Sequence, residues 1–293
     1  MSLFSFKNGT MLKIAIQKSG RLYDYSLQLL KECGIEINNG NRQLKAVGFN
    51  FPVEIYFLRD DDIPQYVFDK VADVGFVGEN VVYEKSKDIE VVSKLGFGKC
   101  RLSIAVPKNM NYESVTDLQN LKIATSYTTL LQNFLDNKKV NAEIHEISGS
   151  VEIAPGIGLA HAICDLVSSG STLFTNGLKE VEVVLNSEAV LVANKSLSPE
   201  NKKILANFLM RINAVKAAKN NKYILLNAPN SQLHNIASVL PGMKSPTIVP
   251  LAESGWSSVQ SVVNESDFWE IIEKLKSFGA EGILVVPIEK MIL

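Results

Sequence analysis

Strands and helices alternate through the first two thirds of the chain, and this alternation limits the fold more than any other feature. Residues 11–17 are an apolar, β-prone segment, residues 22–34 have helical spacing, and residues 51–59 alternate like a strand. A short helix over residues 60–70 and an apolar strand over residues 71–78 continue the run. A β-α-β-α-β order of this kind is typical of a parallel sheet covered by helices.

A second run of the same kind follows the first. Its periodicity predicts strand 121–127, helix 129–140, strand 142–148, helix 151–162, strand 163–167 and a helix opening within 171–178. Residues 180–194 are then predicted to be extended chain that returns to the first sheet. The two runs predict two α/β lobes joined by crossing strands, and ligands in such sheets bind outside the carboxyl ends of the strands.

The pattern changes after the second run. Residues 197–221 predict a long helix, with Ser198 as its N-cap and Pro199 at its first position. The segments beyond it follow a β-α-β-β-α-β order over roughly 70 residues, which is the ferredoxin-like split unit, and Asp267 and Glu270 have capping-box spacing before the last helix. We expect lobe I at residues 1–105 and 184–220, lobe II at residues 106–183, and a separate C-terminal domain at residues 221–293.

Composition argues against several classes of protein. The formal charge is −1 over 293 residues, so there is no basic surplus for a general nucleic-acid binder. No segment approaches the ~18 apolar residues of a membrane helix, and no signal peptide is recognisable at the start. The three scattered cysteines, Cys33, Cys100 and Cys164, argue against disulfides and a zinc site, and they fit a reducing cytoplasm.

The segment ICDLVSSGSTL, residues 163–173, places hydroxyl residues around a glycine directly after a strand that carries an acid. Backbone amides and the hydroxyls of Ser168, Ser169, Ser171 and Thr172 suit a phosphate at a helix start, and Gly170 permits close approach. Asp165 suits sugar hydroxyls, which a carboxylate binds well. The alternative is a serine-rich turn that only caps a helix.

Charged and polar residues also follow other strands. Lys18 and Arg21 follow the first strand and Arg59 the next, where they suit polyphosphate oxygens; the alternative is that they are solvated surface charges. The segment ADVGFVGEN offers contacts to a base or ribose through Asp73, Gly78, Glu79 and Asn80, although a plain glycine turn is the alternative.

Arg101 lies inside an apolar strand, where an arginine faces either a cleft or a partner carboxylate; both interpretations stay open. The three histidines, His145, His161 and His234, have no nucleophile partner at a suggestive spacing and are interpreted as structural or surface residues. This argues against hydrolysis by a nucleophile–base pair.

Nine segments between residues 14 and 291 together resemble the ATP phosphoribosyltransferase family in its long form. They are IAIQKSGRL, FLRDDDIP, ADVGFVGEN, FGKCRLSIAVP, KIATSY, GSVEIAP, ICDLVSSGSTLFTNGL, SPTIVPLA and GILVVPIEKM. The resemblance implies two periplasmic-binding-protein-like catalytic lobes and a C-terminal regulatory domain. It also implies the first step of histidine biosynthesis, in which adenine N1 of ATP attacks the anomeric carbon of phosphoribosyl pyrophosphate and pyrophosphate leaves, with Mg²⁺ on the polyphosphates.

The same resemblance implies roles for individual residues. Phosphoribosyl pyrophosphate would bind at Asp165, Leu166, Val167, Ser168, Ser169, Gly170, Ser171 and Thr172. The catalytic cations would be Lys18, Arg21 and Arg59, and the nucleotide side would be lined by Asp73, Gly78, Glu79, Asn80 and Arg101. Thr247 would lie in a feedback site for histidine, and the chain would form homo-oligomers, as dimers and hexamers. The carboxylates of Asp60, Asp61 and Asp62 could hold Mg²⁺ beside a phosphate, and the alternative is an acidic helix start, which is favoured for Asp61 and Asp62. No ligand of Mg²⁺ is assigned.

One segment departs from the family pattern. After KIATSY the family often has a proline, whereas this chain has Thr128 and Thr129, which leaves the local loop shape open. The competing hypothesis for the whole chain is a two-lobed binding or effector-sensing module without catalysis, because two lobes with a cleft serve both purposes.

Overall fold

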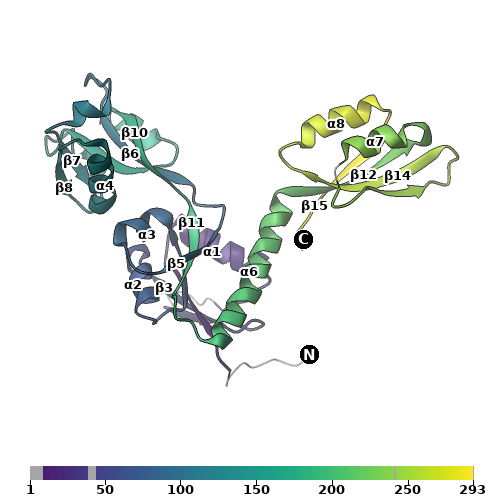
Figure 1. Ribbon diagram of the computed structural model, residues 1–293, viewed down its shortest axis with the longest axis horizontal. Helices are drawn as coiled ribbons and strands as arrows, with labels where there is room; N and C mark the ends of the chain where they lie inside the picture. Colours follow the sequence, from purple (N-terminus) through teal and green to yellow (C-terminus); the bar gives the residue numbers. More distant parts are fainter. Residues whose placement is uncertain (1–8, 39–43, 241, 293) are drawn as a thin grey trace. The chain divides into compact units, whose positions relative to one another are not determined.

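The structure is a computed structural model that describes residues 9–38, 44–240 and 242–292 (Figure 1). The chain divides into two compact units, Met1–Ala206 and Asn207–Leu293. No helix in the part of the chain that the structure describes is long and apolar enough to span a membrane.

The first sheet of the N-terminal unit has six strands in the order β2-β3-β1-β4-β11-β5. These strands are β1 (Leu12–Gln17), β2 (Lys45–Val47), β3 (Val53–Leu58), β4 (Val74–Gly78), β5 (Glu90–Lys94) and β11 (Ala189–Ala193). β3, β1 and β4 are parallel, and β11 runs antiparallel to β4. The parallel strands are continuous apolar runs because helices cover both faces of such a sheet.

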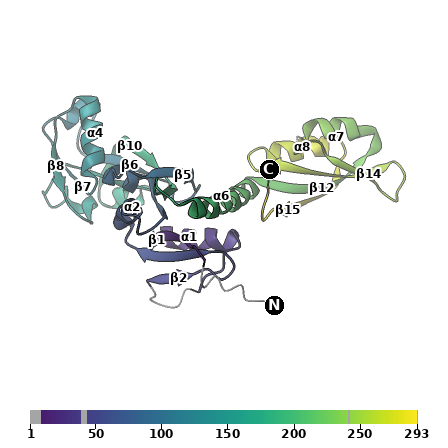
Figure 2. The ribbon, with the colours of Figure 1, turned by 60° about the horizontal axis from the view of Figure 1, so that its bottom comes forward.

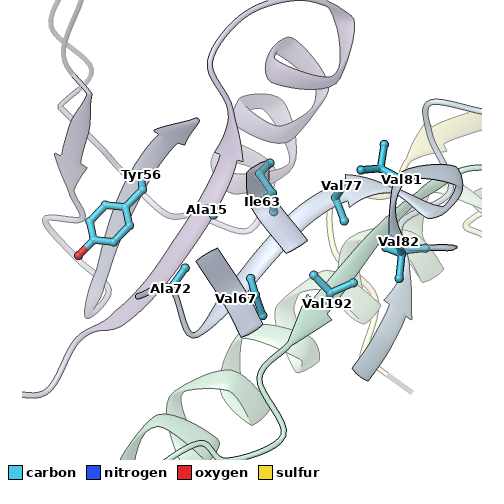
Figure 3. Close-up of a cluster of buried hydrophobic side chains, with 10 residues drawn as sticks. Ala15, Tyr56, Ile63, Val67, Ala72, Val77, Val81, Val82 and Val192 are labelled. Atoms are coloured by element: carbon cyan, nitrogen blue, oxygen red, sulfur yellow. The ribbon is translucent and has the colours of Figure 1, made fainter. Parts of the chain in front are cut away.

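Helices α1 (Arg21–Glu32), α2 (Ile63–Phe68) and α3 (Glu79–Lys85) connect these strands, and a 3-10 helix, Asp60–Asp62, leads into α2. Figure 3 shows buried side chains gathered between α2, α3 and the strands, among them Ile63, Val67 and Val192. Gly75 of β4 permits this packing, since a Cβ there would lie 2.5 Å from Cγ2 of Ile63. Because β1, β3 and β4 are parallel, their carboxyl ends share one edge of the sheet.

The second sheet has five strands in the order β10-β6-β9-β7-β8. They are β6 (Cys100–Pro107), β7 (Lys122–Thr125), β8 (Glu143–Glu146), β9 (Ala162–Val167) and β10 (Leu178–Ser187), with helices α4 (Thr128–Lys138) and α5 (Ser171–Thr175). The chain enters this sheet through β6 and leaves it from β10 into β11 of the first sheet, which confirms the two predicted lobes. The expected boundaries at 105/106 and 183/184 fall inside β6 and β10.

The helix predicted over residues 151–162 was wrong. Only a short 3-10 helix, Val151–Ile153, forms there, and the chain then continues in turns. Gly158 has φ +76°, a backbone conformation that a right-handed helix does not contain. Val151, Ala154 and Ala160 are nevertheless buried, so the apolar spacing that resembled a helix serves the core of the second lobe.

Helix α6 (Pro199–Lys219) follows β11, and its first turn is capped as predicted, because the amide of Asn201 donates to Oγ of Ser198 at 3.1 Å. Next come β12 (Asn221–Pro229), α7 (Leu233–Val239), β13 (Thr247–Pro250), β14 (Trp256–Asn264), α8 (Phe268–Ser277) and β15 (Glu281–Pro287). These four strands form an antiparallel sheet in the order β13-β14-β12-β15, which confirms the ferredoxin-like fold. Figure 2 shows α7 and α8 on one face of this sheet.

The capping box predicted at the start of α8 does not form. Asp267 is the residue before the helix, but its carboxylate accepts a hydrogen bond from Oγ of Ser266 at 2.7 Å. Glu270 pairs instead with Lys274 one turn later, at 2.6 Å. The residues have the spacing of a capping box, but the hydroxyl of the neighbouring Ser266 binds the Asp267 carboxylate instead.

Candidate functional site

The edge where β1, β3 and β4 end collects polar residues from three connecting segments. Lys18 follows β1, and its amide donates to the carbonyl of Leu58 at the end of β3 at 2.8 Å. Arg59 follows β3, and both Lys18 and Arg59 are exposed. Gly78 ends β4. Because the strands are parallel, these segments lie at one edge of the sheet, where ligands of such folds bind.

A cavity of about 340 Å³ opens at this edge. It is lined by Gln17, Arg21, Leu22, Tyr25, Asp60, Gly78, Asn80, Gly98, Lys99, Cys100, Leu166, Ser168 and Ala189. The lining thus joins the strand ends of the first lobe to the end of β9 in the second lobe. Five residues predicted from the sequence, Arg21, Gly78, Asn80, Leu166 and Ser168, are brought together here.

The loop after β9 has the local geometry that the sequence suggested. Ser168, Ser169, Ser171 and Thr172 are exposed, and Gly170 has φ +81° and ψ 0°, a left-handed conformation that favours glycine. The hydroxyls of Ser169 and Ser171 lie 3.0 Å apart. The loop therefore presents a compact group of hydroxyls beside the cavity.

Asp165 precedes this loop within β9. Its Oδ1 accepts the amide of Leu166 at 2.7 Å. The pKa of its carboxyl is raised, mainly because the group is largely buried, while the Leu166 hydrogen bond acts in the opposite direction. Val167, the last residue of β9, is buried in the core of this lobe and supports the loop from below.

Arg101 binds a partner carboxylate, which was one of its two open interpretations. Its Nε and Nη2 both donate to the carboxylate of Glu180 at 2.5 Å, and Nη1 donates to the carbonyl of Ser168 at 3.3 Å. The Arg101 hydrogen bonds lower the pKa of Glu180. Oγ of Ser103 also donates to Glu180, at 2.7 Å. Arg101 thus holds the start of the hydroxyl loop and does not line the cavity.

Asn80 and Glu79 differ in what their side chains contact. Asn80 is 4% exposed; its Oδ1 accepts from Oγ of Ser187 at 2.9 Å, and its Nδ2 donates to the hydroxyl of Tyr127 at 3.2 Å. Glu79 is 6% exposed and pairs with Lys94 at 3.2 Å, outside the cavity lining. Asn80 therefore connects the two lobes at the cavity, whereas Glu79 fixes the start of α3.

The Thr128–Thr129 segment, where the chain departs from the family pattern, begins helix α4. Its free amides bind a carboxylate from the other lobe: the amides of Thr129 and Leu130 donate to Glu84 of α3, each at 3.0 Å. A carboxylate at a helix N-terminus is stabilised by the amides and by the helix dipole. Glu84 is thus a second link between the lobes, which sequence reasoning missed because its partners are more than 40 residues away.

Two predicted residues lie apart from the cavity. Asp73 precedes β4, at the amino end of the strand, and its Oδ2 accepts the amide of Lys13 at 2.8 Å. The opposite end of β4 reaches the cavity, so the structure does not bring Asp73 to the site. Thr247 begins the edge strand β13 of the C-terminal unit, where it is exposed and paired in register with Gln260.

Asp60 lines the cavity; from the sequence it stood out only as one of three carboxylates after Arg59 that could hold Mg²⁺. It is the first residue of the 3-10 helix after Arg59, and its Oδ1 is buried with no hydrogen-bond partner among the described residues. Burial, with a contribution from the charge of Asp61, raises the pKa of Asp60 from 3.8 to about 7. Its position directly after a parallel strand was the available sequence signal.

No group of three or more histidine, cysteine, aspartate or glutamate side chains that could hold a metal ion occurs within residues 9–38, 44–240 and 242–292. The described residues therefore do not form a metal site whose ligands all come from the protein. Mg²⁺ needs no such site when it binds substrate phosphates and water.

Comparison with known proteins gives a consistent result. A family model described as ATP phosphoribosyltransferase matches residues 59–214, and one described as HisG, C-terminal domain, matches residues 218–290. An ATP phosphoribosyltransferase of Cytophaga hutchinsonii is 60% identical over 283 residues, covering 97% of this chain and 99% of the relative. One of Bacteroides thetaiotaomicron is 58% identical and covers 97% and 100%.

Solved structures agree on the fold. The ATP phosphoribosyl transferase (HisG:HisZ) complex from Thermotoga maritima contains a chain that is 27% identical, with a TM-score of 0.61, covering 69% of this chain and 96% of that one. Tv2483 bound to L-arginine has a TM-score of 0.50 at 13% identity, covering 71% and 86%, and this likeness concerns the fold alone.

Proposed function

The chain belongs to the ATP phosphoribosyltransferase family of histidine biosynthesis, and on that premise we propose how its cavity performs the transfer. ATP and phosphoribosyl pyrophosphate are the substrates, and adenine N1 attacks the anomeric carbon as pyrophosphate leaves. The non-catalytic sensor is not favoured, because near-full-length relatives at 58–60% identity carry the name of the enzyme.

The hydroxyl loop, residues 168–172, together with the end of β9, residues 165–167, binds the 5-phosphate of the sugar donor. The observation that carries this proposal is that Ser168 and Leu166 line the same cavity as Arg21, Gly78 and Asn80. A phosphate held by the loop would thus lie beside the strand ends of the other lobe. The carboxyl of Asp165 then takes the sugar hydroxyls, which are hydrogen-bond donors.

The cations at the strand ends stabilise the leaving group. Lys18, Arg21 and Arg59 are exposed at the edge that carries the cavity, and Lys99 adds a further cation to its wall. In the transition state the sugar gains positive charge and the departing pyrophosphate gains negative charge. Cations fixed in advance at the leaving group stabilise that charge without reorganisation. Mg²⁺, bound with the polyphosphates, supplies the same kind of charge stabilisation.

Asn80 and Gly78 lie on the nucleotide side, and the links through Tyr127 and Glu84 hold the two lobes so that the substrates meet in one orientation. Arg101 supports the loop through Ser168 and Glu180. Glu79 supports the start of α3, and Asp73 is left out of the proposed site.

The C-terminal domain, residues 221–293, is proposed to be regulatory. Thr247 lies on an exposed edge strand and is a candidate contact for histidine as feedback inhibitor. We also propose a homo-oligomer, as a dimer or hexamer, and a cytoplasmic location, which the three scattered cysteines fit. Titrating histidine into the full chain and following activity and assembly size tests these points.

The activity itself is tested by mixing the full chain with ATP, phosphoribosyl pyrophosphate and Mg²⁺, and measuring pyrophosphate together with the mass of the nucleotide product. Pyrophosphate should form only when both substrates are present, in equal amount to phosphoribosyl-ATP. Pyrophosphate without that nucleotide product, or no turnover at all, contradicts the proposed function.

A further inference from the structure

The carboxyl group of Asp60 is the feature of the cavity that the substrate contacts proposed above leave unused. It lies on the wall with Gln17, Arg21 and Asn80, one residue after the cation Arg59. Its Oδ1 has no partner among the described residues. A buried carboxyl oxygen without a partner is costly, and such groups in enzyme sites commonly have a function that offsets the cost.

Several charged or titratable groups face Asp60 from the neighbouring elements. Asp61 follows it and is paired weakly with Lys85 of α3 at 3.9 Å. Arg21 of α1 and Lys99 lie on the wall of the same cavity. The hydroxyl of Tyr127, at the start of α4, has a raised pKa, mainly from burial and then from the charges of Asp165 and Asp60. Asp60 is therefore close to the junction of the two lobes.

The substrates offer few groups that a carboxyl can bind. Their phosphates are anions and repel it, and the sugar hydroxyls of the phosphoribosyl donor are assigned to Asp165 on the other lobe. The remaining donor near the reacting atoms is the exocyclic amino group of adenine, next to N1. Leu22, Tyr25 and Leu166 give the cavity apolar walls that suit a planar ring.

We propose that the Asp60 carboxylate binds the exocyclic amino group of adenine and takes one of its protons as N1 forms the bond to the sugar. The proposal rests on the function proposed above. The N1 lone pair forms the bond to the anomeric carbon, and the bond from that carbon to pyrophosphate breaks, its electrons leaving on pyrophosphate. The amino N–H pair becomes the C6=N double bond of a neutral 6-imino product, and the proton rests on Asp60 until water removes it.

The chemistry of the carboxyl fits this step. A proton acceptor works best when its pKa is near the working pH, and burial brings the pKa of Asp60 to about 7, well above an ordinary aspartate. Above that pH the carboxylate is ready to accept the proton. Below it, Asp60 is already protonated and the step loses its acceptor.

The test compares the full-length wild type with Asp60→Asn and Asp62→Asn. Asparagine keeps the shape of Asp60 and a hydrogen-bond acceptor but cannot take a proton, and exposed Asp62 is a control with the same change in charge. The measurement is kcat/KM for ATP from about pH 5.5 to about pH 8.5. Titration of the substrate phosphates is common to the three proteins and cancels in their ratios.

The ratio of wild type to Asp60→Asn is expected to be about 100 at pH 8.5 and to fall to about 3–4 at pH 5.5, which is the size and shape expected of a general base. The ratio for Asp62→Asn should stay near 1. A ratio for Asp60→Asn that is close to 1, or large but independent of pH, overturns the proposal, since a structural role gives the latter. Wild type that makes no phosphoribosyl-ATP contradicts instead the function on which the proposal rests.

Discussion

Replacing Asp60 by asparagine should stabilise the folded protein, and by an amount that depends on pH. The wild type buries a carboxyl whose Oδ1 has no partner, and burial raises its pKa from 3.8 to about 7. In the unfolded chain the same group titrates near its ordinary value. The folded state therefore binds the proton more tightly than the unfolded state does.

The two pKa values of Asp60, in the unfolded and in the folded state, set the sign and size of the change in the free energy of unfolding with pH. Below about pH 4 the carboxyl is protonated in both states, and the protein keeps the full stability that this group allows. As the pH rises from about 4 to about 7, the unfolded state ionises first and stability is lost. The two values lie about three pH units apart, and each unit corresponds to about 1.4 kcal/mol, which gives a loss of about 4 kcal/mol. Local relaxation around the charge reduces this figure, so about 2 to about 4 kcal/mol is expected.

The assay is chemical denaturation of wild type and Asp60→Asn at one fixed protein concentration, at several pH values between about 4 and about 8. The difference in free energy of unfolding removes the contributions of all other titrating groups. It should grow in favour of the variant across this range and level off above about pH 7. Asp62→Asn should show no such growth. A difference that is flat with pH refutes the burial of an unpartnered Asp60 carboxyl oxygen.

Three further predictions concern the rest of the site. Arg59→Ala should lower kcat by about 100-fold while weakening ATP binding much less, because the cation acts on the charge of the departing pyrophosphate; an unchanged kcat in steady-state assays removes Arg59 from this role. Gly170→Ala should weaken binding of phosphoribosyl pyrophosphate by about tenfold in calorimetry, because φ +81° costs an alanine about 1 kcal/mol or more and the loop then leaves the conformation that binds the phosphate. Gly177→Ala, with φ +70° outside the loop, should leave that affinity unchanged. Glu84→Gln should lower the free energy of unfolding by about 1 kcal/mol, because a neutral side chain at the start of α4 loses the interaction with the helix N-terminus, and equal stability to the exposed control Glu90→Gln would show that this link contributes nothing.

The succession of the main strands along the chain and the places where they end were predictable from the sequence, because hydrophobic runs and glycines mark the ends of strands. The order of the strands within the two sheets of the lobes was not predicted, and neither were the short strands β2 and β5. The predicted strand ends were enough to bring Arg21, Gly78, Asn80 and Ser168 to one edge. Asp73 was predicted to line the site because it belongs to the segment ADVGFVGEN, without regard to which end of the strand it occupies. It precedes β4, and a residue at the amino end of a parallel strand faces away from the ligand edge.

Other features depended on partners distant in sequence. Arg101 is paired with Glu180 in a neighbouring strand, and no local pattern distinguishes this ion pair from a ligand contact. Glu84 reaches the start of α4 in the other lobe in the same way. The raised pKa of Asp60 arises from burial, which only the folded arrangement of the 3-10 helix Asp60–Asp62, the cavity and the neighbouring lobe creates.

A structure of the full chain with phosphoribosyl pyrophosphate bound tests the central claim most directly. The 5-phosphate should lie within hydrogen-bond distance of the amides and hydroxyls of residues 168–172, with the diphosphate toward Lys18, Arg21 and Arg59. A donor bound elsewhere contradicts the assignment of the two ends of the cavity. So does a donor with its diphosphate in the hydroxyl loop and its 5-phosphate at the cations.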